Sequence, residues 1–186
     1  MNRQTPGFIG RRAACSRQSQ SGFTLIEVLV AVLVLSIGLV GVAALQGVSL
    51  KNTQSAFMRS QATALAYDLA DRMRANRLSA EVGLYDPDTA ATVAACKSTT
   101  GCIPQDLAKH DLAEWNASIA TYLPMGQGFV CLDSTPADGV SATSPACDGS
   151  GTQFAVKIWW DENRDGEIEN DNTATNPERL AVTVEL

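Results

Sequence analysis

The side chain that stands out first for its chemistry is Glu27, a single carboxylate at the start of an apolar segment. It is the fifth residue after Gly22, and the 18 residues from Val28 to Leu45 carry no charge. A segment of that length and composition can cross a membrane as a helix. Because a carboxylate is costly in lipid, its presence at this position requires a specific reason. One interpretation is a side chain that reaches out to the membrane surface.

A second group of oxygen-bearing side chains runs from Asp161 to Asn172. It matches the calcium-loop pattern D-x-[DN]-x-[DN]-G, with an isoleucine at the eighth place. The calcium ligands would be Asp161, Asn163, Asp165, the Glu167 carbonyl and Glu169. The twelfth place holds Asn172 where such loops have a bidentate glutamate, and no helix flanks the segment. The sequence leaves two interpretations open, a Ca²⁺ site and an acidic turn between two strands.

No group of residues in the sequence suggests catalysis. The single histidine, His110, lies between Lys109 and Asp111 and off the apolar stripe of its predicted helix, so we expect it at the surface. It has no neighbouring nucleophile and no second histidine for a triad or a metal site. The net charge of −6 argues against nucleic acid as the main partner. We therefore expect neither an enzyme nor a nucleic-acid-binding protein.

The segment before the apolar run is basic. Residues 1–22 carry four arginines and no acid, so removing them would take the net charge from −6 to −10. An ordinary secretory signal places its apolar region before the cleavage site. Here a polar stretch runs directly into Gly22, and the apolar region follows it. A positive leader stays in the cytoplasm, which places the C-terminal part of the chain outside.

The string GFTLIEVLVA, beginning at Gly22, resembles the N-terminus of type IV prepilins. The resemblance implies that a prepilin peptidase cleaves between Gly22 and Phe23 and that Phe23 is then N-methylated. It also implies that Glu27 neutralises the positive N-terminus of a neighbouring subunit and so sets the register of assembly. An uncleaved signal anchor is the alternative.

Four cysteines follow the leader, which itself contains Cys15. They lie in a part of the chain that we expect to face the periplasm, where disulfides persist. We expect the pairs Cys96–Cys102 and Cys131–Cys147, because neighbours in sequence close the shortest loops. A zinc site is the rival interpretation, but the sequence has no C-x-x-C pair and one histidine.

The elements that must position these residues begin with a long helix, which we expect to continue to about Leu78. Beyond Gln46 it becomes amphipathic, and one apolar stripe recurs at helical spacing: Met58, Ala62, Leu65, Leu69 and Met73. A loop over 79–103 leads to a second helix that opens at Pro104. Its stripe would comprise Ala108, Leu112, Trp115, Ile119 and Tyr122.

Three strands are expected after the second helix, over 128–132, 153–160 and 179–186. Their alternation indicates one buried face for each strand, and their short connections indicate an antiparallel sheet. Trp160 would share the buried face, while Trp159 would contact the long helix or lie exposed. The predicted fold is α+β, with a leader over 1–22, a membrane or filament-core segment over 23–46, an amphipathic segment over 47–78 and a head over 79–186.

Two further stretches resemble PilV-type minor pilins of the type IV pilus. The stretch from Leu65 to Arg77 is similar to that family's LA-x-x-L-x-[ED]-RMRANR segment, and the stretch from Asp111 to Gly126 to its D-x-x-x-W and LP-x-G segments. The RMRANR run itself would be either a charged subunit contact or a solvated helix end.

The resemblance implies a structural protein that joins a minor-pilin complex, primes pilus assembly and lies near the tip. Its partners would be other minor pilins, the major pilin, the inner-membrane assembly platform, the prepilin peptidase and a tip adhesin. Before assembly it would be a single-pass inner-membrane protein with a periplasmic head, and after assembly part of an extracellular pilus. The alternatives are a type II secretion pseudopilin and a membrane-anchored, calcium-dependent binding domain.

Overall fold

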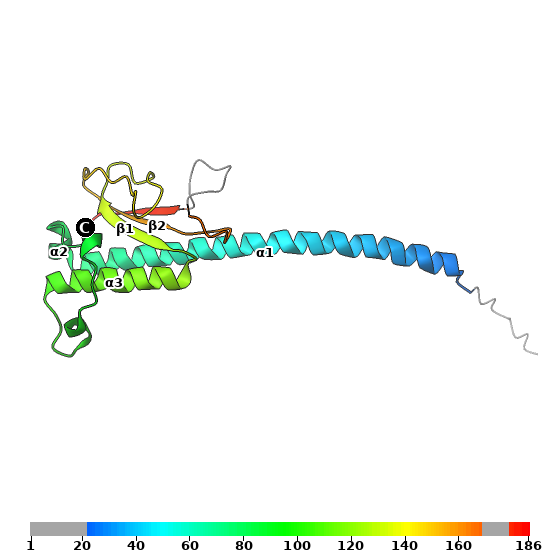
Figure 1. The fold of residues 1–186 in the computed structure, drawn as a ribbon, viewed down its shortest axis with the longest axis horizontal. Coiled ribbons are helices and arrows are strands. Elements are labelled where there is room, and N and C mark those ends of the chain that lie inside the picture. The colour runs from blue at the N-terminus through cyan, green and yellow to red at the C-terminus, as the bar shows by residue number, and fades with distance from the viewer. Residues whose placement is uncertain (1–21, 169–178) are drawn as a thin grey trace, which may run out of the picture. The chain divides into compact units, whose positions relative to one another are not determined.

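The computed structural model describes residues 22–168 and 179–186, which form two compact units, one ending at Gly47 and the other beginning at Val48. Figure 1 shows the helices and strands in chain order. The helices are α1 (Leu25–Ala75), α2 (Arg77–Glu81) and α3 (Pro104–Tyr122), and the strands are β1 (Gln127–Leu132), β2 (Phe154–Trp159) and β3 (Arg179–Val184). The predicted α+β class, a long N-terminal helix with a small antiparallel sheet, is confirmed.

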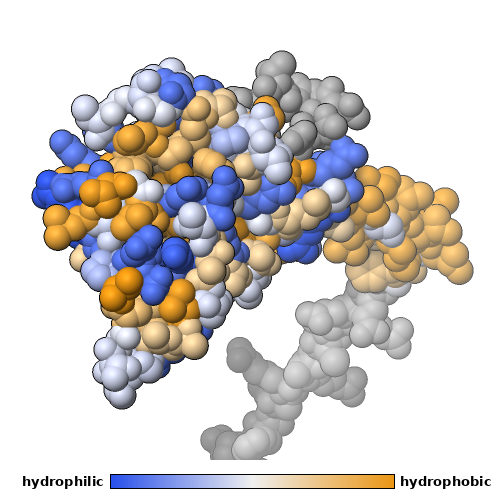
Figure 2. Space-filling model, turned by 60° about the vertical axis from the view of Figure 1, so that its left-hand side comes forward, coloured by the Kyte–Doolittle hydropathy of each residue, from blue (hydrophilic) through white to orange (hydrophobic). Residues whose placement is uncertain are grey.

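The first unit is the N-terminal part of α1, which starts directly after Thr24. The Glu27 N–H donates to the Thr24 carbonyl at 3.1 Å and lies 3.3 Å from its Oγ1, so Thr24 caps the helix. Every side chain from residue 22 to residue 47 is exposed. Among the described residues, α1 is the one helix long and apolar enough to cross a membrane. Figure 2 shows the apolar part of α1, at the right of the view, as a nearly continuous hydrophobic surface.

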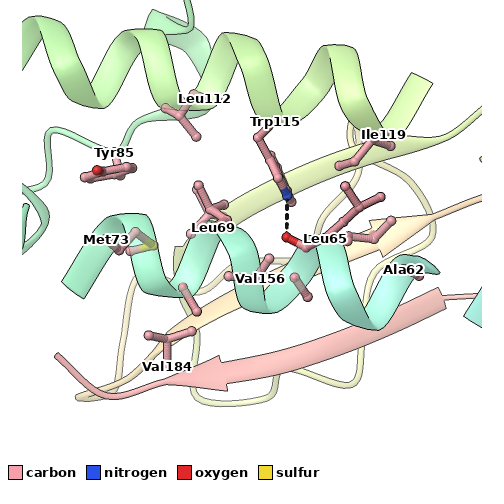
Figure 3. Close-up of a cluster of buried hydrophobic side chains, with 14 of the residues drawn as sticks. Ala62, Leu65, Leu69, Met73, Tyr85, Leu112, Trp115, Ile119, Val156 and Val184 are labelled. Atoms are coloured by element: carbon pink, nitrogen blue, oxygen red, sulfur yellow. Dashed lines mark hydrogen bonds between the residues drawn. The ribbon is translucent and has the colours of Figure 1, made fainter. Parts of the chain in front are cut away.

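In the second unit, the amphipathic part of α1 lies alongside α3 (Figure 1). All five residues of the predicted α1 stripe are buried, which confirms that prediction. They meet the buried stripe of α3, and the Trp115 Nε1–H donates to the Leu65 carbonyl at 2.9 Å (Figure 3). That bond satisfies the polar end of an otherwise apolar ring. The predicted place of Tyr122 on the stripe is wrong, because α3 ends there and Leu123 turns into the core instead.

The three strands pair antiparallel in the order β1-β2-β3, as expected, with Val130, Val156 and Val182 in register. One face of the sheet joins the helical core through Val156, Ile158 and Val184. Gly128 permits a close approach of α3, since a Cβ there would lie 2.4 Å from the Trp115 ring. The sheet and the two helices thus share one hydrophobic core.

The expectation of one buried face is wrong for β2. Its outward side chains Ala155, Lys157 and Trp159 are also fully buried. Lys157 makes polar contacts with the loop between β1 and β2, so this loop covers the outer face of the strand. Trp159 is therefore neither exposed nor part of the helical core.

The first helix ends slightly earlier than predicted. Asn76 leaves the helical conformation, with φ −114° and ψ 46°, and α2 begins at the next residue. Its Nδ2 donates to the Pro104 carbonyl at 2.8 Å, which ties the break in the helix to the start of α3. The predicted loop over 79–103 contains two short 3₁₀ turns, Pro87–Thr89 and Ala94–Lys97.

Candidate functional site

The predicted processing site lies at the start of the described chain. Gly22 precedes the helix, and a Cβ added to it would meet no atom within 4 Å. Phe23 is 82 % exposed. Nothing in the described fold therefore requires glycine at position 22. The rest of the leader, with Cys15, lies outside the described residues.

Glu27 lies in the first turn of α1 and is exposed. A carboxylate is favoured at this end of a helix, where unpaired N–H groups carry partial positive charge. It is the sole charged residue between Phe23 and Leu50. The structure thus places one acid at the beginning of an otherwise uncharged helical surface.

That surface is apolar on all sides of α1 in the first unit. Exposed fractions run from 52 % at Val42 to 84 % at Leu25. A helix that is hydrophobic all round is stable when lipid or other helices surround it. Three glycines in or next to this part of the helix, Gly38, Gly41 and Gly47, likewise have open space around them. The described part of this chain does not cover the surface.

The two stretches that resemble minor pilins meet in the second unit. Arg72 of α1 bonds Asp111 at 3.1 Å and Glu114 at 3.2 Å, both on α3, and Asp68 at 3.0 Å on its own helix. The hydroxyl of Tyr85 donates to the other Asp111 oxygen at 2.8 Å. Arg72 therefore joins α1 to α3, with Asp111 buried between them.

The electrostatics of this contact follow from its charges. Burial acts to lower the pKa of Arg72, but hydrogen bonds to Glu114 and Asp111 outweigh it and the pKa is raised. Hydrogen bonds from Arg72 and Lys97 lower the pKa of Glu114. Burial, together with the Asp111 carboxylate, raises the pKa of Tyr85. These shifts favour a protonated Arg72, an ionised Glu114 and a neutral Tyr85.

Neither interpretation of the RMRANR run holds for all of its residues. Arg72 faces α3, Met73 is fully buried and Asn76 bonds the start of α3. Arg74 and Arg77 are half-exposed or more and pair with acids close by in sequence, at 2.9 and 2.6 Å. The run is thus mainly an internal contact. In the sequence, the residue that pointed to this internal contact is Asp111. It lies three residues after Ala108 and four before Trp115, on the edge of the buried stripe.

The prediction that His110 lies at the surface is wrong. Its side chain is buried, because the segment before α3 folds back over it. Nδ1 accepts the Val93 N–H at 3.1 Å, and Nε2 lies 3.3 Å from a Glu114 oxygen. No feature of the sequence pattern pointed to this packing. The histidine holds the loop to α3 and meets no nucleophile there.

The described part of the predicted calcium loop forms a turn closed by its own hydrogen bonds. Asp161 accepts from the backbone of Arg164 at 2.6 Å and of Gly166 at 2.9 Å. Asn163 Nδ2 donates to Asp165 at 2.8 Å, and Asp165 accepts from the Glu167 N–H at 2.9 Å. Among the described residues, the carboxylates of this loop do not form a group of three possible metal ligands. Glu169, Asp171 and Asn172 lie outside the described residues, and calcium binding stays a prediction.

The cysteines are paired as the sequence predicts. Disulfides join Cys96 to Cys102 and Cys131 to Cys147, with Cα–Cα distances of 4.7 and 6.3 Å. In the described chain, one group of possible metal ligands comprises Cys131, Cys147 and Asp133. Its two sulfurs are bonded to each other, so they offer no thiolate to a metal.

The burial of a second charged or polar side chain, the amine of Lys157, was not predicted from the sequence. Its side chain is 0 % exposed and its Nζ lies 2.5 Å from an Asp133 oxygen and 2.8 Å from Asp138. The signal was its outward position in a strand between Ala155 and Trp159, opposite a loop that carries several acids. Strand alternation alone placed it in solvent.

Comparisons with known proteins agree with these features. A family model described as type IV pilin Tt1218 matches residues 44–113, and one described as the prokaryotic N-terminal methylation motif matches residues 17–43. No curated protein and no solved structure matches the chain. The matched segments run without a gap from the end of the basic leader into α3. With the apolar helix and the three-stranded antiparallel sheet, they identify the chain as a type IV pilin that carries a prepilin N-methylation motif.

Proposed function

We propose that this pilin is a minor subunit of the type IV pilus and joins other minor pilins in a complex that primes assembly and lies near the tip. The observation that carries the proposal is the first part of α1, which is exposed on all sides and has Glu27 as its one charge. Such a helix requires a hydrophobic environment, first the inner membrane and then the helices of neighbouring subunits.

In this proposal the prepilin peptidase cleaves between Gly22 and Phe23, and Phe23 is methylated at its new amino group. A Cβ at position 22 would meet no atom within 4 Å, so the fold does not require a glycine there. This supports a requirement set by another protein, such as recognition by the peptidase. The exposed Phe23 is accessible to an enzyme. Cleavage leaves a positive amino group at the start of an apolar helix.

Glu27 then sets the register between subunits. The new amino group of one subunit and the Glu27 carboxylate of its neighbour are each costly in an apolar environment and attract each other there. A pair between them is formed at one relative height of two helices. Axial displacement of one helix would leave both charges without a partner.

The resemblance to minor pilins supports the assignment within the family. The two stretches that carry it bond one another through Arg72 and Asp111, and through Trp115 and the Leu65 carbonyl. They thus form one structural unit of the head. The expected partners are other minor pilins, the major pilin, the assembly platform and a tip adhesin.

The test is complementation of a strain that lacks this chain, with surface pili counted by electron microscopy. Wild type should restore pili, and Glu27→Gln should reduce the number of pili and its own incorporation into them. Glu81→Gln, which removes an exposed acid from α2, is the matched control and should behave as wild type. Normal incorporation of Glu27→Gln would exclude the register role.

The same strain separates the pilus from type II secretion. We expect its deletion to remove surface pili and to leave protein secretion unchanged. Loss of secretion with pili intact would instead identify a pseudopilin. Full function of a chain in which cleavage at Gly22 is blocked would indicate a membrane-anchored binding domain that acts as a monomer.

A further inference from the structure

The buried amine of Lys157 lies beneath the loop between β1 and β2. Its Nζ contacts Asp138 Oδ1 at 2.8 Å, the Pro145 carbonyl at 2.8 Å and the Asp138 carbonyl at 3.3 Å. The closest atom is Asp133 Oδ2 at 2.5 Å. Both Lys157 and Asp133 have side chains that are 0 % exposed.

The contact between Lys157 and Asp133 differs from the others around the amine. Asp133 Oδ1 accepts the Thr135 N–H at 3.0 Å, whereas the buried Oδ2 has no hydrogen-bond partner although Nζ lies 2.5 Å away. The two groups are thus in close contact without the angles of a hydrogen bond. A buried ion pair is costly to desolvate unless its remaining polar atoms are well bonded.

We propose that Lys157 and Asp133 are joined by an isopeptide bond between the Lys157 Nζ and the Asp133 side-chain carbon. One proton passes from the ammonium to the carboxylate, which leaves an amine and a carboxylic acid. The nitrogen lone pair attacks the carboxyl carbon, the carbon–hydroxyl bond breaks, and the hydroxyl takes a second proton from nitrogen and leaves as water. The products are one amide and one water, and no further reactant is needed.

The surroundings of the pair favour this reaction. Exclusion of water removes the medium that stabilises two separate charges and holds the reacting groups together. Asp138 bonds Nζ directly and is partly exposed, so it is placed to relay protons between the amine and the departing oxygen. Hydrogen bonds from Lys157 and Thr135 lower the pKa of Asp138, which keeps it a carboxylate able to accept a proton from the amine.

The bond would be a second covalent cross-link of the loop between β1 and β2. Cys131 and Cys147 already join the end of β1 to the far part of the loop. An amide from Asp133 to Lys157 would join the start of the loop to the middle of β2 and, unlike a disulfide, would survive reducing agents. The inference does not depend on the role of the chain in the pilus.

The first test is the intact mass of the full chain, purified in detergent and fully reduced. With the bond, the chain is lighter by one water than its sequence requires. Lys157→Met and Asp133→Ala should each have the full sequence mass, whether or not they are less stable. Asp138→Asn should slow or prevent the loss of water, and Asp148→Asn, an acid of the same loop that bonds Ser134 and Ser150, should leave it unchanged.

Peptide mapping locates the bond. Between His110 and Val156 the chain has no lysine or arginine, so trypsin should miss Lys157 and release residues 110–164 as one peptide, lighter by one water. Cleavage before Asp138 and Asp148 should then yield a branched pair, with residues 148–160 attached to the segment that ends at Ala137. Complete tryptic cleavage at Lys157 together with the full intact mass would refute the proposal.

Discussion

The two units of this chain differ in whether their apolar side chains are buried. From Val48 onward, the amphipathic part of α1, α3 and the sheet enclose one core, and large residues such as Trp115 and Leu69 are almost fully buried. From Phe23 to Gly47, apolar residues are more frequent than in the head and remain exposed around the whole helix. The head is thus complete within one chain, and the other unit requires other molecules to cover it.

The difference shows that the distribution of apolar residues around one helix specifies different surroundings for its two parts. In its second part the apolar residues form a stripe, which specifies one partner surface within the chain. In its first part they surround the helix, which specifies a hydrophobic environment and leaves the partner open. Within that environment Glu27 is the residue that distinguishes one position along the helix from another.

A charge placed within the first unit should have the largest effect on membrane retention and assembly. Arginine at the centre of a membrane helix costs about 2.5 to 3.5 kcal/mol on insertion scales. We expect Leu35→Arg to lose membrane retention and incorporation into pili, while the melting temperature of the head stays unchanged. Membrane fractionation and pilus immunoblots measure the first effect, with Leu35→Ala as the control. Normal incorporation of the arginine variant would contradict the proposal that lipid and then neighbouring subunits surround this part of the helix.

Removal of Trp115 should affect the head alone. Truncation of a buried tryptophan typically costs about 3 to 5 kcal/mol, and the hydrogen bond to the Leu65 carbonyl would also be lost. We expect Trp115→Ala to lower the free energy of unfolding of the full chain in detergent by that amount, measured with urea. Trp115→Phe keeps a ring but not the hydrogen bond, and should cost less. An unfolding transition equal to wild type for the alanine variant would contradict the shared core.

The elements of the head were largely predictable, because their patterns are repetitive. The stripe from Met58 to Met73 and the strand alternation around Val156 each indicate burial on one side. His110 and Lys157 were not, because their burial depends on loops that fold over an element from outside. The pattern of residues along one helix or strand does not show whether a distant loop packs over its outer face. The disulfides were predictable because short loops close at low entropic cost.

The smallest effect concerns the contact between α1 and α3 in acid. The pKa of Glu114 is lowered from its ordinary 4.5 by hydrogen bonds from Arg72 and Lys97. Its contribution to stability is therefore complete above about pH 4.5 and is lost as the pH falls through the lower pKa of the folded state. Because Glu114 is partly exposed, the effect is small.

We expect Glu114→Gln to be slightly less stable than wild type at neutral pH and equal to it in acid, so that its stability changes less with pH. Urea unfolding at several pH values measures this difference. Glu81→Gln serves as the control, since Glu81 pairs with Arg77 on the same short helix, α2. A constant difference between Glu114→Gln and wild type at all pH values would exclude the proposed ionisation.

The most direct test of the account is mass spectrometry of the N-terminal peptide of this chain in sheared, purified pili. We predict that the chain is present there, that it begins at Phe23 and that its first residue carries one methyl group. A chain found in membranes but absent from pili, or one that retains residues before Phe23, would contradict the account. That result would leave the uncovered helix as a membrane anchor for the head.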